Sequence, residues 1–167
     1  MKYISVLENK GYIIFTKKEK YTEIKINLSN LPKNKKLGLH IHEYGDMRSN
    51  YLSKKNGGDF GVPIKCCSSA GVHYNPYKKE HGNLNSKESH LGDLGNIITN
   101  KNGLCKCILK AKKIKLNTKY DILGRMLILH DNEDDLGLKN NKKSKLTGNS
   151  GNRLVCGIIG LMNKNYK

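Results

Sequence analysis

The sequence predicts an all-β domain built as a β-sandwich or a Greek-key barrel. Eight short runs of β-forming residues recur along the chain, turn signals separate them, and no segment shows a convincing helical period. Seventeen glycines against three prolines agree with many tight turns. At 167 residues the chain can bury one ordinary hydrophobic core, so we expect a single domain over residues 1–167.

The predicted strands follow one another in short, regular steps. The turn sequences ENKG at residues 8–11 and NKNG at residues 100–103 each separate two strands, and both are predicted to close hairpins. Residues 21–28 alternate with period two, as a half-buried strand does. The positions expected to share one face there are Thr22, Ile24, Ile26 and Leu28. The eight predicted strands cover residues 3–7, 12–16, 21–28, 37–41, 96–99, 104–109, 125–129 and 155–159.

Two long segments, residues 43–94 and 131–153, show no periodicity. Loops of this length in a compact domain are usually functional or disordered. The first segment holds four candidate metal ligands and the second follows the last histidine. Since a disordered linker is not expected to collect ligands, we expect both segments to fold as loops of a functional site.

The N-terminal sequence and the charge of the chain bear on its cellular location and on nucleic-acid binding. A charge interrupts the apolar run of residues 1–8 too early for a signal peptide, and no stretch approaches the roughly 20 apolar residues of a membrane span. We therefore expect a soluble cytoplasmic protein, in a host cytoplasm or a virion if the source is viral. The net charge of +17 is typical of nucleic-acid binding. However, the basic residues are scattered and mostly lysine, and Lys, Asn and Ile are enriched together, which favours an AT-rich genome and no specific nucleic-acid partner.

All six histidines fall into one pattern that is typical of metal binding. The first two form an H-x-H pair, and residues two apart on a strand point to the same face. The next three and an aspartate form H-x7-H-x8-H-x2-D, a set of three nitrogens and one oxygen that suits tetrahedral zinc. Six imidazoles and one carboxylate suit two adjacent metal ions that share a ligand. The candidates are His40, His42, His73, His81, His90, Asp93 and His130.

Each histidine taken singly is explained by an ordinary structural role. However, the short sequence motifs around the histidines occur together and in a definite order along the chain. These motifs are GVHYNP at residues 71–76, HLGDLGN at 90–96, HD at 130–131, DDLG at 134–137 and GNRLVCG at 151–157. Through them the chain from about residue 37 to residue 160 resembles the copper/zinc superoxide dismutase family. The resemblance implies an eight-stranded antiparallel Greek-key β-barrel (an immunoglobulin-like sandwich) with two long functional loops.

The resemblance also implies a role for each candidate residue. The implied copper ligands are His40, His42, His73 and His130. The implied zinc ligands are His73, His81, His90 and Asp93. His73 would therefore bridge the two ions. Asp134 would hydrogen-bond one histidine of each set, His40 and His81, and such a bond fixes the tautomer and the orientation of a ring.

The activity that the resemblance implies is dismutation of superoxide in antioxidant defence. Copper would oxidise one superoxide to oxygen and reduce a second to hydrogen peroxide, while zinc stays redox-silent. Arg153 would dock the anion, His73 would deliver a proton, and Thr147 would narrow the channel. The alternative is a non-catalytic copper- and zinc-binding protein, a buffer or a chaperone, on the same fold; such a protein needs neither Arg153 nor Thr147. A basic nucleic-acid-binding or virion protein is a third alternative that rests on charge alone.

The cysteines and two unusual segments complete the predictions. The resemblance implies a disulfide between Cys67 and Cys156, with Cys66 as a competitor. Cys105 and Cys107 form a C-x-C pair that could transfer a metal, although two same-face thiols without a role are the favoured interpretation. Residues 47–66 are an insertion in the loop that ordinarily contributes to the family's dimer interface, and it is long enough to alter that contact. The resemblance implies a homodimer, and a copper chaperone is a further implied partner. The basic sequence NNKKSK at residues 140–145 reflects either lysine bias or stronger attraction of superoxide.

Overall fold

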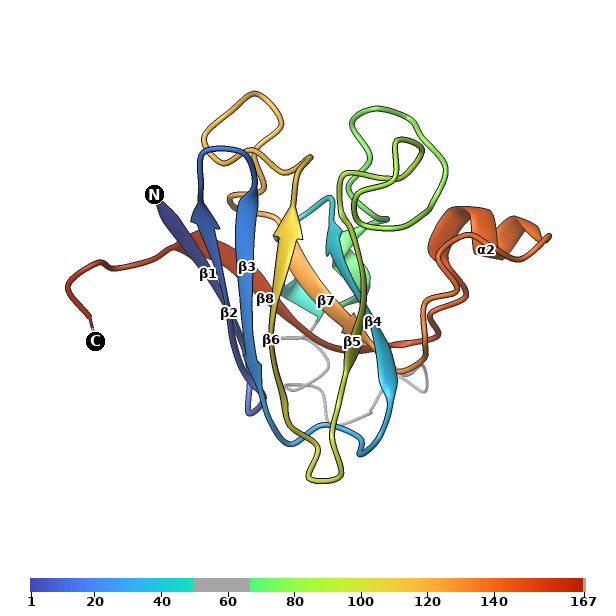
Figure 1. Cartoon of the computed structure of the whole chain (residues 1–167), viewed down its shortest axis with the longest axis horizontal. Helices are drawn as coiled ribbons and strands as arrows, with labels where there is room; N and C mark the ends of the chain where they lie inside the picture. Colours follow the sequence, from blue (N-terminus) through green and yellow to red (C-terminus); the bar gives the residue numbers. More distant parts are fainter. Residues whose placement is uncertain (50–66, 167) are drawn as a thin grey trace.

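The computed structural model describes residues 1–49 and 67–166, and within them eight antiparallel strands form a nearly closed barrel (Figure 1). The strands are β1 (Lys2–Leu7), β2 (Gly11–Lys17), β3 (Thr22–Leu28), β4 (Lys36–His42), β5 (Asp93–Ile98), β6 (Cys105–Ala111), β7 (Met126–His130) and β8 (Arg153–Leu161). All eight predicted strands are therefore confirmed, with ends that differ by at most three residues. Most of the predicted insertion at 47–66, Cys66 included, lies outside the described residues.

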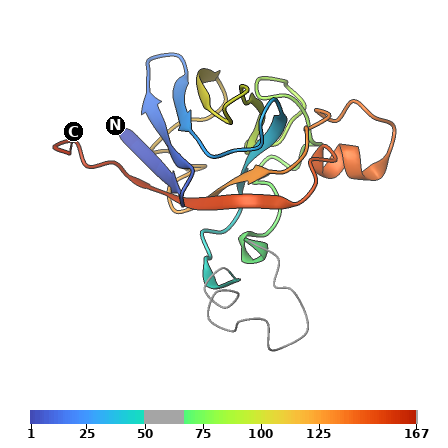
Figure 2. The ribbon, with the colours of Figure 1, turned by 90° about the horizontal axis from the view of Figure 1, so that it is seen from below.

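The strands are hydrogen-bonded in the order β5-β4-β7-β8-β1-β2-β3-β6. The connections from β3 to β4 and from β6 to β7 therefore pass from one side of the barrel to the other, which gives the Greek-key topology. Figure 2 shows β8 running along one side, where it joins β1 and β2 to β7 and β4. Every paired neighbour is antiparallel.

One of the two predicted hairpins is only partly confirmed, because its turn forms but the strands that it joins do not pair. The turn at residues 100–103 forms, with Gly103 at φ 70° and its amide donating to the Asn100 carbonyl at 3.0 Å. However, β5 and β6, the strands that it joins, are the two edges of the sheet and are not hydrogen-bonded neighbours. They diverge because β5 pairs with β4 and β6 pairs with β3, on opposite sides of the barrel. The other predicted hairpin, at residues 8–11, pairs β1 with β2 as expected.

The barrel interior is filled by the inward positions of the strands. In β3 the residues Thr22, Ile24, Ile26 and Leu28 are buried and the intervening ones are more exposed, as the alternation predicts. Fully burying an aliphatic side chain of this kind contributes about 1.5–3 kcal/mol, so the core can hold the sheet closed although two edges remain unpaired. The barrel thus gives a rigid frame from which β4 and β7 present their side chains.

The described parts of the long loops include short helical segments. The 3₁₀ turn η1 (Ser68–Ala70) follows Cys67, and helix α2 (Lys142–Thr147) projects from the barrel at the right of Figure 1. The Asn141 side chain caps α2 by accepting from the Ser144 amide at 2.8 Å. A six-residue helix is too short to show a helical period, so the sequence did not predict it. Neither α2 nor any other helix of the described residues has the length and apolar character that a membrane crossing requires.

Candidate metal centre

All seven predicted metal ligands meet in one buried cluster beside β4. His40 and His42 come from β4 and His130 ends β7, while Asp93 begins β5. The remaining ligands, His73, His81 and His90, come from the long loop between β4 and β5, and all seven side chains are buried. Within that loop His73 forms a β-bridge with His42, which holds the loop against the strand. The described part of this loop therefore folds as part of the site, as the sequence predicts.

The first group of ligand atoms belongs to His40, His42, His73 and His130, and these atoms all lie within 4.8 Å of one another. His40 Nδ1, His42 Nε2 and both ring nitrogens of His130 are buried without a hydrogen-bond partner. A buried polar atom without a partner costs about 1–3 kcal/mol. Several such nitrogens facing one point fit a metal ion, because each can give it a lone pair.

The second group is centred on the carboxylate of Asp93. The Nδ1 atoms of His73, His81 and His90 lie 3.0, 3.0 and 3.1 Å from its Oδ1 atom. A tetrahedral zinc ion with ligands at about 2.0 Å has ligand–ligand edges of about 3.3 Å, so these distances are close to those of a zinc site. The other oxygen, Oδ2, accepts from the amides of Gly82 and His90 at 3.0 and 2.9 Å, which holds the carboxylate in place.

The boundary between the two groups is not sharp. A second set of ligand atoms within 4.8 Å of one another contains His40, His73, His81 and Asp93, with His40 in the place expected for His90. His90 reaches the set through its 3.1 Å contact with Asp93. His40 and His73 belong to both sets, but the Nε2 atom of His40 is hydrogen-bonded to Asp134, whereas His73 has its Nδ1 atom against Asp93 and its Nε2 atom left for the first group. His73 therefore lies where a ligand shared by two ions must lie.

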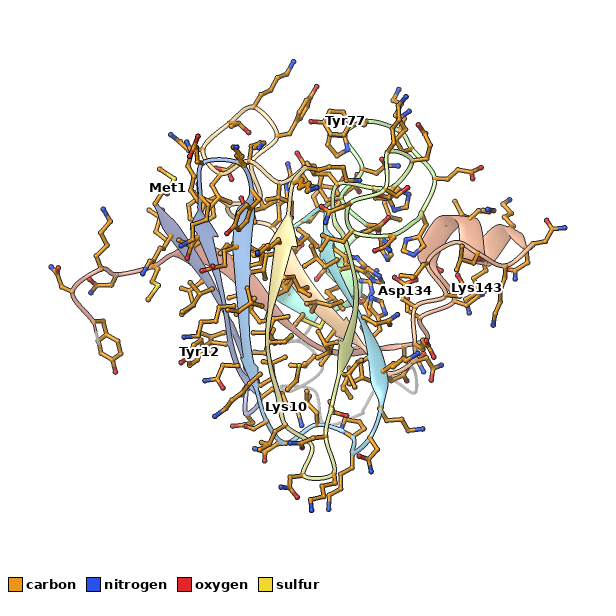
Figure 3. All side chains as sticks on the ribbon, viewed as in Figure 1. Met1, Lys10, Tyr12, Tyr77, Asp134 and Lys143 are labelled. Carbon is orange, nitrogen blue, oxygen red and sulfur yellow. A yellow bond between two sulfur atoms is a disulfide. The ribbon has the colours of Figure 1, made fainter. Side chains whose placement is uncertain are left out.

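Asp134 joins the two groups from behind (labelled in Figure 3, between β4 and α2). Its Oδ2 accepts from His40 Nε2 at 2.8 Å and its Oδ1 accepts from His81 Nε2 at 2.7 Å. With the proton fixed on Nε2, the Nδ1 of each ring is left free to bind a metal. The Asp134 backbone is itself held by two hydrogen bonds to the Asn96 side chain, both 2.8 Å long.

Burial controls the protonation of the imidazoles. It lowers the pKa of His40 to about 4, of His73 to about 3 and of His130 to about 4, and it holds the pKa of His42 well below its usual value. Burial alone would also lower the pKa of His81, but hydrogen bonds to two carboxylates outweigh it and raise that pKa to about 9. The four rings of the first group are therefore neutral at neutral pH and can offer lone pairs to a metal.

An open cleft of about 710 Å³ leads from solvent to the first group. Its lining includes His42, His73, His130, Lys143, Thr147 and Arg153. The Arg153 guanidinium donates to the backbone carbonyls of Cys67 and Gly71, which fixes it beside the histidines. The predicted disulfide is present between Cys67 and Cys156, with Cα atoms 6.2 Å apart, and it ties the long first loop to β8, the strand that carries Arg153.

Two residues that sequence reasoning missed support the cluster. Gly148, the C-cap of α2, has φ +65°, and a Cβ atom there would lie 1.9 Å from Asp134 Oδ1. Only glycine lets the backbone pass over this carboxylate. Lys113 donates from Nζ to the carbonyls of Ser89 and His90, at 3.1 and 3.4 Å. A glycine directly after a short helix is a C-cap signal, whereas no sequence pattern marks Lys113.

Comparisons with known proteins agree with this geometry. The model of the family described as copper/zinc superoxide dismutase matches residues 9–159. A superoxide dismutase [Cu-Zn] of Paramecium bursaria Chlorella virus 1 is 38% identical over 165 residues, 98% of this chain and 80% of the viral protein. One of Cryptococcus neoformans is 38% identical over 167 residues, 96% of this chain and 98% of that protein. The crystal structure of the clock protein EA4 superposes with a TM-score of 0.81 at 33% identity, over 96% of this chain and 94% of that one.

Proposed function

The chain belongs to the copper/zinc superoxide dismutase family, and we propose that its buried cluster holds one copper and one zinc ion on opposite sides of His73. The activity is dismutation of superoxide to oxygen and hydrogen peroxide, and the protein is an oxidoreductase. The observation that carries the proposed arrangement is the position of His73, whose Nδ1 atom faces Asp93 and whose Nε2 atom is left for the first group. His40 also belongs to both sets of ligand atoms, but its Nε2 atom is hydrogen-bonded to Asp134.

The proposed copper ligands are His40, His42, His73 and His130. The proposed zinc ligands are His73, His81, His90 and Asp93. Unpartnered buried nitrogens support the first set, and the convergence of three Nδ1 atoms on Asp93 supports the second. Copper supplies a one-electron redox couple when bound, and zinc, which has no accessible redox state, supplies charge and rigidity.

The cleft residues act on the anion before and during turnover. Arg153, held by two backbone carbonyls, presents a fixed positive charge next to the first group, where a small anion can dock. Lys143, on the exposed face of α2, adds positive charge at the cleft. Thr147 lines the cleft as well, and its hydroxyl donates to the Lys143 carbonyl at 3.0 Å, so that its side chain is oriented.

His73 and Asp134 control protons and ring positions. Reduction of superoxide to hydrogen peroxide consumes two protons, and His73 Nε2 can hold one of them at the point where the cleft meets the cluster. Its Nδ1 remains against Asp93 meanwhile, so the ring does not lose its position. Asp134 keeps His40 and His81 in the tautomer that leaves Nδ1 free.

The wider assembly follows the same proposal. The whole chain acts as one domain, into which residues 47–66 are inserted. It works as a homodimer in the cytoplasm, with a copper chaperone as loading partner. Size-exclusion chromatography with light scattering checks the dimer, and fractionation checks the location, because one curated relative, from Drosophila melanogaster, is named an extracellular superoxide dismutase.

Metal loading combined with an activity assay tests the proposal. The purified protein is loaded with copper and zinc, its metal content is measured, and superoxide decay is followed with and without cyanide. We expect one copper and one zinc per chain and cyanide-sensitive dismutation. Full occupancy without activity would support the non-catalytic metal-binding alternative, and failure to retain either metal would overturn the ligand assignment. The Lys164→Ala variant, which changes an exposed side chain outside the cluster and the cleft, serves as a control for copper binding.

A further inference from the structure

Cys105 and Cys107 form a close thiol pair that lies outside the metal centre. They are two residues apart on β6, so both side chains point to the same face of the strand, and their sulfur atoms lie 3.8 Å apart. Cys105 is buried in the barrel core, whereas Cys107 is only partly buried. The pair thus combines a thiol that small molecules can reach with a second thiol directly behind it.

The position of the pair leaves room for the backbone to move. β6 pairs with β3 through one edge only, and along the described residues its other edge is an end of the sheet. The Cα atoms of residues i and i+2 on an extended strand are about 6.6–6.8 Å apart, at the upper limit for a disulfide. A bond between these sulfurs therefore requires β6 to bend, which an edge strand tolerates better than a central one.

The acid–base chemistry of the pair is also asymmetric. Either sulfur can donate in the hydrogen bond between the two thiols. The bond raises the pKa of the Cys105 thiol and lowers that of Cys107, which corresponds to a Cys105 thiol that donates to a Cys107 thiolate. A thiolate is the reactive form of cysteine. The sulfur that can be reached is accordingly the nucleophilic one, and the buried sulfur is the one that resolves the product.

We propose that Cys105 and Cys107 form a reversible, peroxide-oxidised dithiol, for which the oxidant is the hydrogen peroxide that this protein releases. The Cys107 sulfur attacks one peroxide oxygen and the O–O bond breaks, giving a sulfenic acid and water. The Cys105 sulfur then displaces the hydroxyl group: the S–S bond forms, the S–O bond breaks, and the Cys105 proton leaves in a second water. Two thiols lose two electrons in total, and one peroxide becomes two waters.

The source of the oxidant rests on the proposed function, whereas the reactivity of the pair does not. The experiment therefore treats the metal-loaded protein in two ways: with added hydrogen peroxide, and with a flux of superoxide in the presence or absence of catalase. Free thiols are then alkylated and the protein is digested with trypsin. Cleavage after Lys101, Lys106 and Lys110 separates the two cysteines, so peptides 102–106 and 107–110 stay together only when a disulfide joins them.

The proposal expects linked peptides, or an uncleaved peptide 102–110 that lacks two hydrogens, and their loss on addition of dithiothreitol. Cys107→Ser should lower the rate of thiol loss by at least about tenfold relative to Cys105→Ser, which keeps the reactive sulfur. Alkylation of both cysteines after peroxide treatment, or a link from either one to Cys66, would overturn it. Linkage by added peroxide but not by superoxide would leave the dithiol intact and contradict the dismutase activity as its source.

Discussion

Removal of the Cys67–Cys156 disulfide tests how the long first loop is held against β8. The two cysteines are 89 residues apart in sequence. For a closed loop of about 90 residues, the chain-entropy relation gives about 4.6 kcal/mol of stabilisation at 25 °C. Alanine at both positions suits this test, because both sulfurs are buried and a serine hydroxyl would add an unsatisfied polar group.

Urea unfolding of the metal-free protein measures this loss. With an m-value of about 2 kcal/mol/M, a loss of 4.6 kcal/mol lowers the midpoint by about 2 M. Activity of the metal-loaded variant should fall as well, since the Cys67 carbonyl is one of the two that hold the Arg153 guanidinium. The unfolding measurement thus tests how much the disulfide stabilises the fold, and the activity measurement tests whether it keeps Arg153 in position.

The reductant supplies the internal control. Reduction of the wild-type protein should reproduce the loss seen in Cys67→Ala/Cys156→Ala, and the same reductant should leave the double variant unchanged. A double variant that unfolds within about 1 kcal/mol of wild type would refute the entropic argument. It would mean that the hydrogen bonds and packing of residues 67–71 hold this part of the first loop without a covalent link.

Three further predictions concern the site. Asp134→Asn should weaken zinc binding by about 10–100-fold in a chelator competition. An amide cannot accept hydrogen bonds from both the His40 and the His81 ring, so one imidazole is forced into the tautomer that carries its proton on Nδ1 and cannot bind a metal there. Unchanged zinc affinity would contradict the tautomer argument. Lys142→Glu/Lys143→Glu should slow superoxide decay more at low than at high ionic strength. The control Lys164→Glu should not, because it belongs to the C-terminal segment, which Figure 1 draws on the side of the barrel opposite α2. An equal loss of rate at both salt concentrations would reject steering. The metal-free protein should lose stability, on the order of a few kcal/mol, as the pH falls from about 6.5 to 4. Burial lowers the pKa of His40 to about 4, so over this window the unfolded chain takes up a proton that the folded chain refuses; a flat urea midpoint between pH 7 and pH 4.5 would contradict it.

The strands could be predicted because each one repeats a local pattern. Residues 21–28 alternate strictly, and the structure buries the expected face of β3. The start of β5 could not be placed, since Asp93 pairs with His40 across a bulge and no alternation marks it. The predicted pairing of β5 with β6 was wrong because the sequence of a turn predicts only the backbone conformation of the turn itself. Which strands become barrel edges depends on contacts with β3 and β4, far away along the chain.

The site residues could be predicted because the spacing of the histidines and the short motifs around them can also be read from neighbouring positions of the sequence. The structure brings all seven candidate ligands together and places Asp134 between His40 and His81. The supporting residues were missed for a physical reason: they act through space. Gly148 matters because its backbone crosses the Asp134 carboxylate, and Lys113 matters because its ammonium reaches the carbonyls of the first loop. Neither of these two contacts can be predicted from the spacing of residues in the sequence.

Anomalous X-ray scattering from crystals of the metal-loaded protein, recorded at the copper and zinc absorption edges, tests the central claim most directly. We predict one copper peak on the Nε2 side of His73 and one zinc peak on its Nδ1 side, each about 2.0 Å from the nearest ring nitrogen. A single peak, two peaks that do not share His73, or copper bound at Cys105 and Cys107 in place of the histidines would contradict it.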